Sequence, residues 1–156
     1  MRVIAIVQAR LDSSRLPKKV IKKVRDKTII EILLKRISKA KKINEIVVAT
    51  TSKISDKSLK KYVNSLGFKC ETGSENNVLN RFIDVAEKYK ADVIGRITGD
   101  CPLIDPSLID KCINKYFETD VDYCSNISPP TFADGLDVEV ISVSALKKIS
   151  KMTQDA

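Results

Sequence analysis

Apolar residues in this chain fall into short continuous runs and into runs with helical spacing. A continuous run predicts a strand that is covered on both faces of a sheet, because such a strand has no side turned to water. We expect strands at residues 2–8, 46–49, 68–71, 92–97, 122–126 and 137–141. Apolar residues that recur every three or four positions predict amphipathic helices at residues 28–42, 59–66, 78–89 and 106–117. The alternation of strands and helices predicts an α/β fold with a largely parallel sheet and helices on both faces.

Local signals define the starts of two of these helices. Asp105 followed by Pro106 predicts the start of the last helix, because aspartate is a good N-cap and proline suits the first helical position. We expect Phe117 near the end of this helix to face the core. The preceding helix follows a turn in which Ser74 or Asn76 is expected to act as the cap.

The length of 156 residues suits a single domain, residues 1–156. The chain has no histidine, which excludes histidine-based catalytic sets and histidine metal ligands. Its four cysteines form no C-x-x-C pair, so we expect reduced, mostly buried thiols and no zinc site. The longest apolar run has five residues, far below the ~20 that a membrane span needs. We therefore expect a cytoplasmic protein without a membrane partner.

Charge is distributed unevenly along the chain. The 28 Lys and Arg residues outnumber the 20 Asp and Glu residues and give a net charge of +8. Residues 1–61 carry 18 basic and 5 acidic side chains, and the remaining residues carry 10 and 15. A basic half attracts polyanions, and nucleic acid is one alternative. We rank it low, because many of these lysines suit the solvated face of a helix and few aromatic residues are present for base stacking.

A basic loop follows the first predicted strand. It contains Arg10, Arg15 and Lys19 as cations, with Ser13 and Ser14 as hydrogen-bond donors. Arginine binds phosphate oxygens with two parallel donors and lysine adds a compact charge, so the loop suits a polyphosphate. The chain lacks the glycine patterns of a P-loop or a dinucleotide-binding fold. An exposed basic turn without a ligand is the alternative.

A second candidate site follows the strand at 92–97. Asp100 comes directly after Gly99 at the carboxyl end of this strand, where a carboxylate is well placed to hold Mg²⁺. A turn residue is the alternative for Asp100, and capping is the expected role of Asp105. Cys101 has no identified base, so we expect a small buried filler rather than a nucleophile. Asp137 and Glu139 alternate on one predicted strand, where they face either a substrate or water.

Three segments together resemble the cytidylyltransferase family that activates acidic sugars. The segments are Q-A-R-L-D-S-S-R-L-P-K-K-V, R-I-T-G-D-C-P-L-I-D-P and D-G-L-D-V-E-V, and they occur in the order found in that family. The chain is most similar to the SpsF-type spore coat polysaccharide proteins, which are related to the CMP-Kdo and CMP-acylneuraminate synthetases. The resemblance implies a three-layer α/β/α, Rossmann-like nucleotidyltransferase fold with a mixed, mostly parallel sheet.

The resemblance also assigns roles to residues. It implies that the basic loop binds the phosphates of CTP and that Asp100 binds Mg²⁺. It places Arg81 against the nucleotide, and Asp137 and Glu139 on the sugar side. The residues that it assigns to the loop are Ala9, Arg10, Ser13, Ser14, Arg15 and Lys19.

The implied reaction is attack of a sugar hydroxyl on the α-phosphorus of CTP, with pyrophosphate as the leaving group. Catalysis then consists of positioning and electrostatics: Asp100 holds the metal, and Arg10, Arg15 and Lys19 neutralise the growing charge. The substrates are CTP and an acidic sugar that the motifs do not identify, and a homodimer is one assembly that the resemblance allows.

The sequence departs from the family pattern in two ways. Family domains continue past the D-G-L-D-V-E-V strand to a second metal-binding aspartate, whereas this sequence ends at Ala156, so the resemblance covers a family domain without its C-terminal part. Single positions also differ: Lys18 stands where many relatives have glycine, and Asn76, Asn77 and Asn80 stand where acidic residues are frequent. A non-catalytic fragment that binds nucleotide is therefore the main alternative to an active enzyme.

Overall fold

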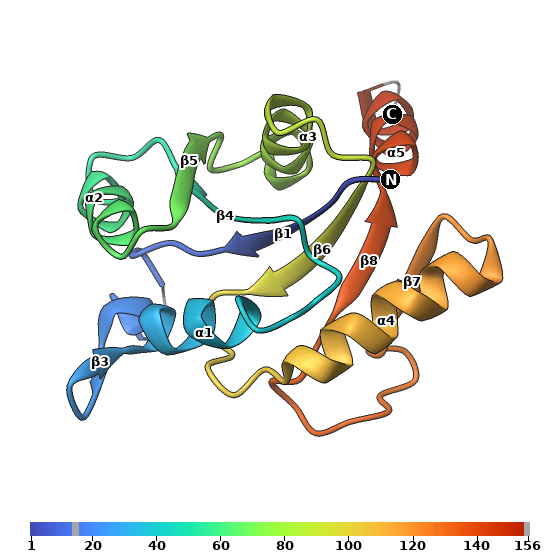
Figure 1. The fold of residues 1–156 in the computed structure, drawn as a ribbon. Helices are drawn as coiled ribbons and strands as arrows, with labels where there is room; N and C mark the ends of the chain where they lie inside the picture. Colours follow the sequence, from blue (N-terminus) through green and yellow to red (C-terminus); the bar gives the residue numbers. More distant parts are fainter. Residues whose placement is uncertain (14–15, 155–156) are drawn as a thin grey trace.

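The computed structural model describes residues 1–13 and 16–154, and a six-stranded sheet forms its centre (Figure 1). The strand order is β5–β4–β1–β6–β8–β7. Strands β5, β4, β1 and β6 are parallel, and β8 runs antiparallel to both β6 and β7. The bounds are β1 Val3–Gln8, β4 Glu45–Thr51, β5 Lys69–Gly73, β6 Val93–Thr98, β7 Tyr123–Ser125 and β8 Glu139–Ser142. The predicted α/β class with a mixed, mostly parallel sheet is confirmed.

Helices cover both faces of this sheet (Figure 1). One apolar cluster joins the sheet to α1, α2 and α4, and a second cluster joins its other face to α3 and α5. The bounds are α1 Ile29–Ile37, α2 Lys57–Ser65, α3 Val78–Lys88, α4 Pro106–Thr119 and α5 Val143–Gln154. A short helical turn, η1 (Lys19–Ile21), and a small hairpin of β2 (Lys23–Val24) and β3 (Lys27–Thr28) precede α1. No helix in the described part of the chain has the length and apolar character that a membrane crossing requires.

The central strand explains why its sequence is apolar at successive positions. Ala5 and Val7 belong to the cluster on one face, and Ile4 and Ile6 belong to the cluster on the other. All four side chains are fully buried. Because both faces of β1 are covered, a continuous apolar run takes the place of a polar–apolar alternation.

The first helix is shorter than its sequence pattern predicts. It ends at Ile37, although apolar and basic residues with helical spacing continue to Lys42. The backbone N–H groups of Lys41 and Lys42 donate to the carboxylate of Asp110 on α4, at 2.8 to 3.0 Å. A tertiary contact therefore replaces the hydrogen bonds that would have extended the helix.

Two further expectations about side chains are wrong. Phe117 is 45% exposed, whereas its neighbour Tyr116 is 8% exposed and continues the buried stripe of α4. The two rings meet edge to face, with centroids 5.1 Å apart. The cap of α3 is Asn77, which accepts from the N–H of Asn80, while Ser74 accepts from the N–H of Asn77.

Helix α5 is absent from the predicted elements. Only Val143 and Leu146 of its apolar residues are buried, and Ile149 is exposed, so its apolar stripe is short. Its contact with α3 includes a polar pair, because the hydroxyl of Ser150 donates to the side-chain oxygen of Asn80 at 2.9 Å. Such a helix is stabilised by its neighbour more than by its own pattern.

Candidate functional site

The carboxyl ends of β1 and β6 form one wall of a pocket of about 230 Å³. The loop after β1 and the turn η1 form the opposite wall. The lining residues are Gln8, Ala9, Arg10, Ser13, Lys19, Val20, Arg96, Thr98, Gly99 and Asp100. The fold thus brings the two candidate sites, 90 residues apart in sequence, to one edge of the sheet, where ligands of such folds commonly bind.

Backbone contacts hold this edge together. The N–H of Ala9 donates to the carbonyl of Ala49 at 3.3 Å, and the N–H of Gly99 donates to the carbonyl of Gln8 at 2.8 Å. A Cβ atom on Gly99 would lie 2.8 Å from that carbonyl oxygen and 2.8 Å from the Cβ of Ala9. Glycine is therefore required here by close approach of two backbone segments.

Lys19 and Asp100 form an ion pair across the pocket. Lys19 reaches it because Lys18 adopts a left-handed backbone conformation with φ of +57°, after which η1 begins. This conformation favours glycine, which accounts for the glycine expected at this position in relatives. The pair places a cation beside a carboxylate at the mouth of the site.

Asp100 is ionised at neutral pH. Partial burial raises the pKa of its carboxyl group, but the hydrogen bond and charge of Lys19, with smaller contributions from backbone and Thr98 hydrogen bonds, outweigh burial and lower this pKa below its ordinary value. The pocket therefore contains a negatively charged oxygen ligand next to the ammonium group of Lys19.

A second hollow of about 460 Å³ adjoins the first and shares Ser13, Lys19, Thr98 and Asp100 with it. Its remaining lining residues are Leu16, Cys101, Asp134 and Asp137. Asp137 thus lies at the site, although it precedes β8 instead of belonging to it.

Cys101 lines this second hollow and is half-buried, so it is less enclosed than the sequence led us to expect. Burial raises the pKa of its thiol, and the charges of Asp100, Asp137 and Asp134 raise it further, against a hydrogen bond with Thr98 that lowers it. A protonated thiol is a poor nucleophile, which agrees with the expectation that Cys101 is not catalytic. All four cysteines are free; Cys70 and Cys112 are buried, and Cys101 and Cys124 are half-buried.

Glu139 lines neither hollow, but it contacts Arg96, which lines the first pocket. Its carboxylate pairs with the guanidinium of Arg96 and accepts from the hydroxyl of Tyr123 at 3.0 Å. Arg96 also approaches the side-chain oxygen of Gln8, at 3.4 Å, and lines the first pocket. The strand register places Arg96 directly opposite Glu139. The carboxylate of Glu139 therefore contacts Arg96 instead of facing a hollow.

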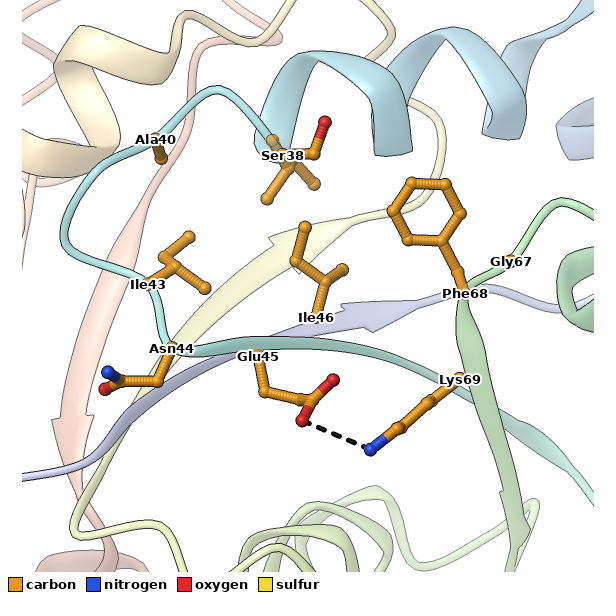
Figure 2. Close-up of a pocket in the computed structure, with 10 residues that line it drawn as sticks. Ser38, Ala40, Ile43, Asn44, Glu45, Ile46, Gly67, Phe68 and Lys69 are labelled. Atoms are coloured by element: carbon orange, nitrogen blue, oxygen red, sulfur yellow. Dashed lines mark hydrogen bonds and ion pairs between the residues drawn. The ribbon is translucent and has the colours of Figure 1, made fainter.

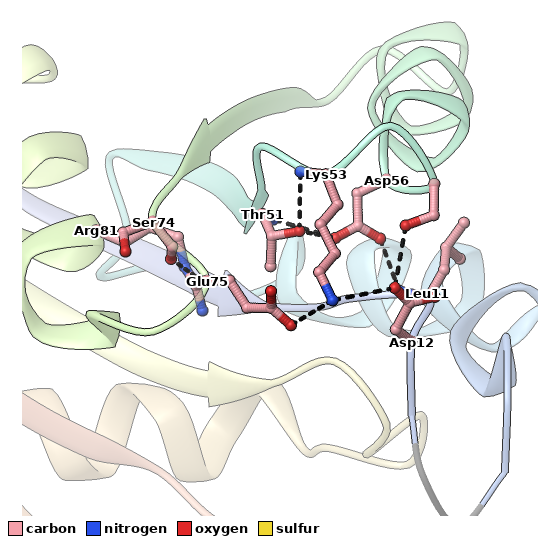
Figure 3. Close-up of polar contacts among 9 residues, drawn as sticks. Leu11, Asp12, Thr51, Lys53, Asp56, Ser74, Glu75 and Arg81 are labelled. Atoms are coloured by element: carbon pink, nitrogen blue, oxygen red, sulfur yellow. Dashed lines mark hydrogen bonds and ion pairs between the residues drawn. The ribbon is translucent and has the colours of Figure 1, made fainter.

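Arg81 is buried, at 3% exposure, and lies outside both hollows. It donates to the carbonyl of Ser74 at 2.7 Å, and its Nε has no hydrogen-bond partner among the described residues (Figure 3). Burial lowers its pKa and the charge of Arg10 lowers it further, while Asp56 and Glu75 oppose this shift. Arg81 therefore lies near Arg10, at this edge of the sheet. Contact of Arg81 with a nucleotide stays a prediction.

Another hollow, of about 330 Å³, lies at the amino ends of β4 and β5, away from these residues (Figure 2). Ile43, Ile46 and Phe68 point into it, and its charged rim consists of Glu45 and Lys69, which pair at 3.2 Å. Its charges are matched within the rim, so it offers a polyanion no converging cations. We therefore assign the site to the carboxyl edge.

Sequence comparison identifies the class of protein to which this architecture belongs. The family model described as cytidylyltransferase matches residues 4–156. This chain belongs to the cytidylyltransferase family. It is 35% identical over 154 residues to the spore coat polysaccharide biosynthesis protein SpsF of Bacillus subtilis, covering 96% of this chain and 63% of SpsF.

Solved structures of cytidylyltransferases share this fold. A cytidylyltransferase from Leptospira borgpetersenii superposes with a TM-score of 0.92 at 33% identity, over 97% of this chain and 64% of that one. A CMP:2-keto-3-deoxy-manno-octonic acid synthetase complexed with CTP gives a TM-score of 0.77 at 18% identity, over 97% of this chain and 78% of that one, and this likeness concerns the fold. The chain therefore spans less than two thirds of the length of SpsF and of the Leptospira protein.

The side chains at the cytidylyltransferase site fit Mg²⁺. In residues 1–13 and 16–154, no group of three or more His, Cys, Asp or Glu side chains is arranged to hold a metal ion by itself. Mg²⁺ does not need such a group, because it commonly takes one or two carboxylates and completes its shell with water and substrate phosphate oxygens. Asp100 offers an ionised carboxylate, and Asp134 and Asp137 line the same hollow.

Several lining residues have little signal in the sequence that predicts a role at a site. Gln8, Arg96 and Thr98 lie in or at the ends of apolar strands and were assigned no role. The available signal was a charged residue, Arg96, inside an otherwise apolar run. Ser14 and Arg15 lie outside the described residues, so their assignment to the loop stays a prediction.

Proposed function

We propose that this cytidylyltransferase binds CTP at the carboxyl edge of β1 and β6 and transfers CMP to an acidic sugar, with release of pyrophosphate. The observation that supports this most directly is the pocket in which Arg10, Ser13 and Lys19 face Asp100. Cations on one wall and a metal-binding carboxylate on the other suit a nucleoside triphosphate better than a neutral ligand.

The residues of the chain act by charge and position. Arg10 and Lys19 lie where they neutralise the phosphates of CTP, and Ser13 adds hydrogen-bond donors. When the sugar hydroxyl attacks the α-phosphorus, the bond to the β-phosphate oxygen breaks and negative charge grows on the departing pyrophosphate. Fixed cations stabilise that charge more strongly than water does, because they do not have to reorient. The mechanism needs no histidine.

Asp100 is the residue that would hold Mg²⁺, and Asp134 and Asp137 line the same hollow. Bound there, the ion supplies Lewis-acid charge to the phosphate oxygens. Lys19 pairs with Oδ2 of Asp100, which leaves Oδ1 as the ligand oxygen for the ion.

The acidic sugar is proposed to occupy the second hollow. Of the described residues, Lys19 is the cation that lines this hollow, and Arg96 is a second cation in the adjoining first pocket, where it pairs with Glu139 and donates to Gln8. The names of relatives support this class of substrate, since they include SpsF and 3-deoxy-manno-octulosonate cytidylyltransferases.

Calorimetric titration tests the nucleotide half of the proposal. CTP should bind in the presence of Mg²⁺, more tightly than ATP, GTP or UTP, and Asp100→Asn should weaken binding by at least tenfold. Asp84→Asn is the matched control, because Asp84 is an exposed aspartate on α3. Absence of CTP binding to the folded chain would contradict a CTP site in these residues.

Pyrophosphate release tests the transfer step. The chain is incubated with CTP, Mg²⁺ and 3-deoxy-manno-octulosonate or N-acetylneuraminate, and each acid is compared with a neutral sugar. Pyrophosphate release with an acidic sugar but not with the neutral sugar supports the proposed substrate class. Pyrophosphate release with the neutral sugar but with neither acid would contradict the proposed substrate class.

A further inference from the structure

Asp56, the residue directly before α2, has a buried carboxyl group that accepts hydrogen bonds from residues outside this helix. It is 1% exposed. An aspartate at this position ordinarily accepts from the first N–H groups of its own helix, but the side chain of Asp56 makes no such bond. It accepts instead from the N–H of Leu11 at 2.8 Å and from both the N–H and the hydroxyl of Thr51 (Figure 3).

These bonds join two carboxyl-edge segments that are otherwise distant in sequence. Leu11 lies in the loop after β1, and Thr51 is the last residue of β4. Both residues are buried, so their N–H groups have no water as an alternative partner. The loss of a buried acceptor therefore leaves a buried donor unpaired, which costs more than the hydrogen bond itself.

Leu11 in turn closes the basic loop. Its carbonyl accepts from the N–H of Ser13 at 2.9 Å and from the N–H of Lys18 at 2.8 Å. One peptide group thus fixes both ends of the segment from Ser13 to Lys18, and Lys18 leads directly into η1, which carries Lys19 to Asp100.

We propose that Asp56 is a positioning residue for the nucleotide loop: it holds Leu11 in place and thereby sets the positions of Ser13 and Lys19 in the pocket. Asp56 touches neither hollow, and it acts through Leu11. The expected effect of Asp56 on CTP affinity rests on the proposed function, whereas its effect on the position of the loop does not.

A second connection between the same segments is more exposed. Asp12 pairs with Lys53 at 3.5 Å and accepts from the hydroxyl of Ser55 at 3.2 Å, and Lys53 pairs with Glu75 at 2.6 Å (Figure 3). Solvent and salt screen such pairs, so they contribute little to a fixed geometry. The buried contact to Asp56 is therefore the one that determines where the loop begins.

Asp56→Asn is the informative substitution. It keeps the shape of the side chain but replaces one acceptor oxygen with an NH₂ group, which faces the N–H of Leu11 or the donors of Thr51. Amide hydrogen exchange measured by NMR should become at least tenfold faster at Leu11 and Lys18. The affinity for CTP should fall by about tenfold or more.

Asp110→Asn is the matched control. Asp110 is another aspartate on a helix that accepts from backbone N–H groups of a loop, in this case those of Lys41 and Lys42, and it lines neither hollow. This variant should increase exchange at Lys41 and Lys42, leave exchange at Leu11 within twofold of wild type, and leave CTP affinity unchanged.

The outcomes separate the two proposals. If wild-type protein does not bind CTP, the proposed function fails, but the exchange rates still decide the role of Asp56. If folded Asp56→Asn keeps wild-type exchange at Leu11 and Lys18, the role of Asp56 is refuted. Equal loss of CTP affinity in Asp56→Asn and Asp110→Asn would also refute it, because general destabilisation then accounts for both.

Thr51→Val is the second test variant, to be used if Asp56→Asn does not fold. This change removes only the hydroxyl that donates to the same carboxyl group. Exchange at Leu11 should still rise by severalfold, and unchanged exchange would refute the proposal.

Discussion

Replacement of Gly99 by alanine tests whether the carboxyl edge is as tightly closed as the structure shows. The added Cβ would lie 2.8 Å from the carbonyl oxygen of Gln8 and 2.8 Å from the Cβ of Ala9, whereas ordinary van der Waals contact begins at 3.4 Å. Relief requires a separation of about 0.6 Å between the end of β1 and the loop that carries Asp100. Neither contact is the free end of a flexible side chain, so the backbone has to move.

The cost follows from this overlap. Overpacking of a closed region destabilises a protein by about 1–3 kcal/mol. For a chain of this size each kcal/mol lowers Tm by roughly 2–4 °C, so Gly99→Ala should lower Tm by about 2–12 °C. The same displacement moves Asp100 relative to Lys19, and CTP affinity should fall with it.

Thermal and urea unfolding of Gly99→Ala and Gly95→Ala provide the measurement. Gly95 lies in the same strand, but a Cβ there meets only the carbonyl of Ile4, at 3.9 Å. Because alanine is also favoured over glycine inside a strand, Gly95→Ala should leave Tm unchanged or raise it slightly. Wild-type stability in Gly99→Ala, or an equal loss in both variants, would refute the close approach.

Two other predictions concern capping and pH. Asp105→Ala should destabilise the protein by about 1 kcal/mol in urea unfolding, because Asp105 accepts from the N–H of Ser107 at the start of α4, and Asp105→Asn should recover most of the loss. The pKa of Asp100 is lowered in the folded state, so its pairing with Lys19 stabilises the protein fully above the unfolded pKa of about 3.9, and this contribution is lost as pH falls through the lower folded pKa. Lys19→Met should therefore be less stable than wild type near pH 7, with a difference that shrinks towards pH 2; a difference that does not change with pH would contradict this account.

The apolar pattern alone determined most of the sheet and the class of fold. Strands that are buried on both faces have continuous apolar runs, and that signal depends only on local sequence. The early end of α1 could not be read in this way, because Asp110 on α4 takes the N–H groups of Lys41 and Lys42. The exposure of Phe117 has the same origin, since the position of α4 on the sheet decides which of two adjacent aromatic residues is covered.

The chemical character of the site was also visible in the sequence. Arg10 and Asp100 come shortly after buried strands, Lys19 follows in the same loop as Arg10, and parallel strands bring their carboxyl ends to one edge. Residue type and the expected parallel sheet therefore predict a phosphate and metal site at this edge.

Only the tertiary structure decided how these residues are held. Asp56 directly precedes α2, and its contact with Leu11, 45 residues away, exists only because β1 and β4 are neighbours in the sheet. Arg96 acquires its place from the register that sets it against Glu139. Local sequence encodes periodicity and chemical type, whereas the partners of buried polar groups depend on which segments the whole fold brings together.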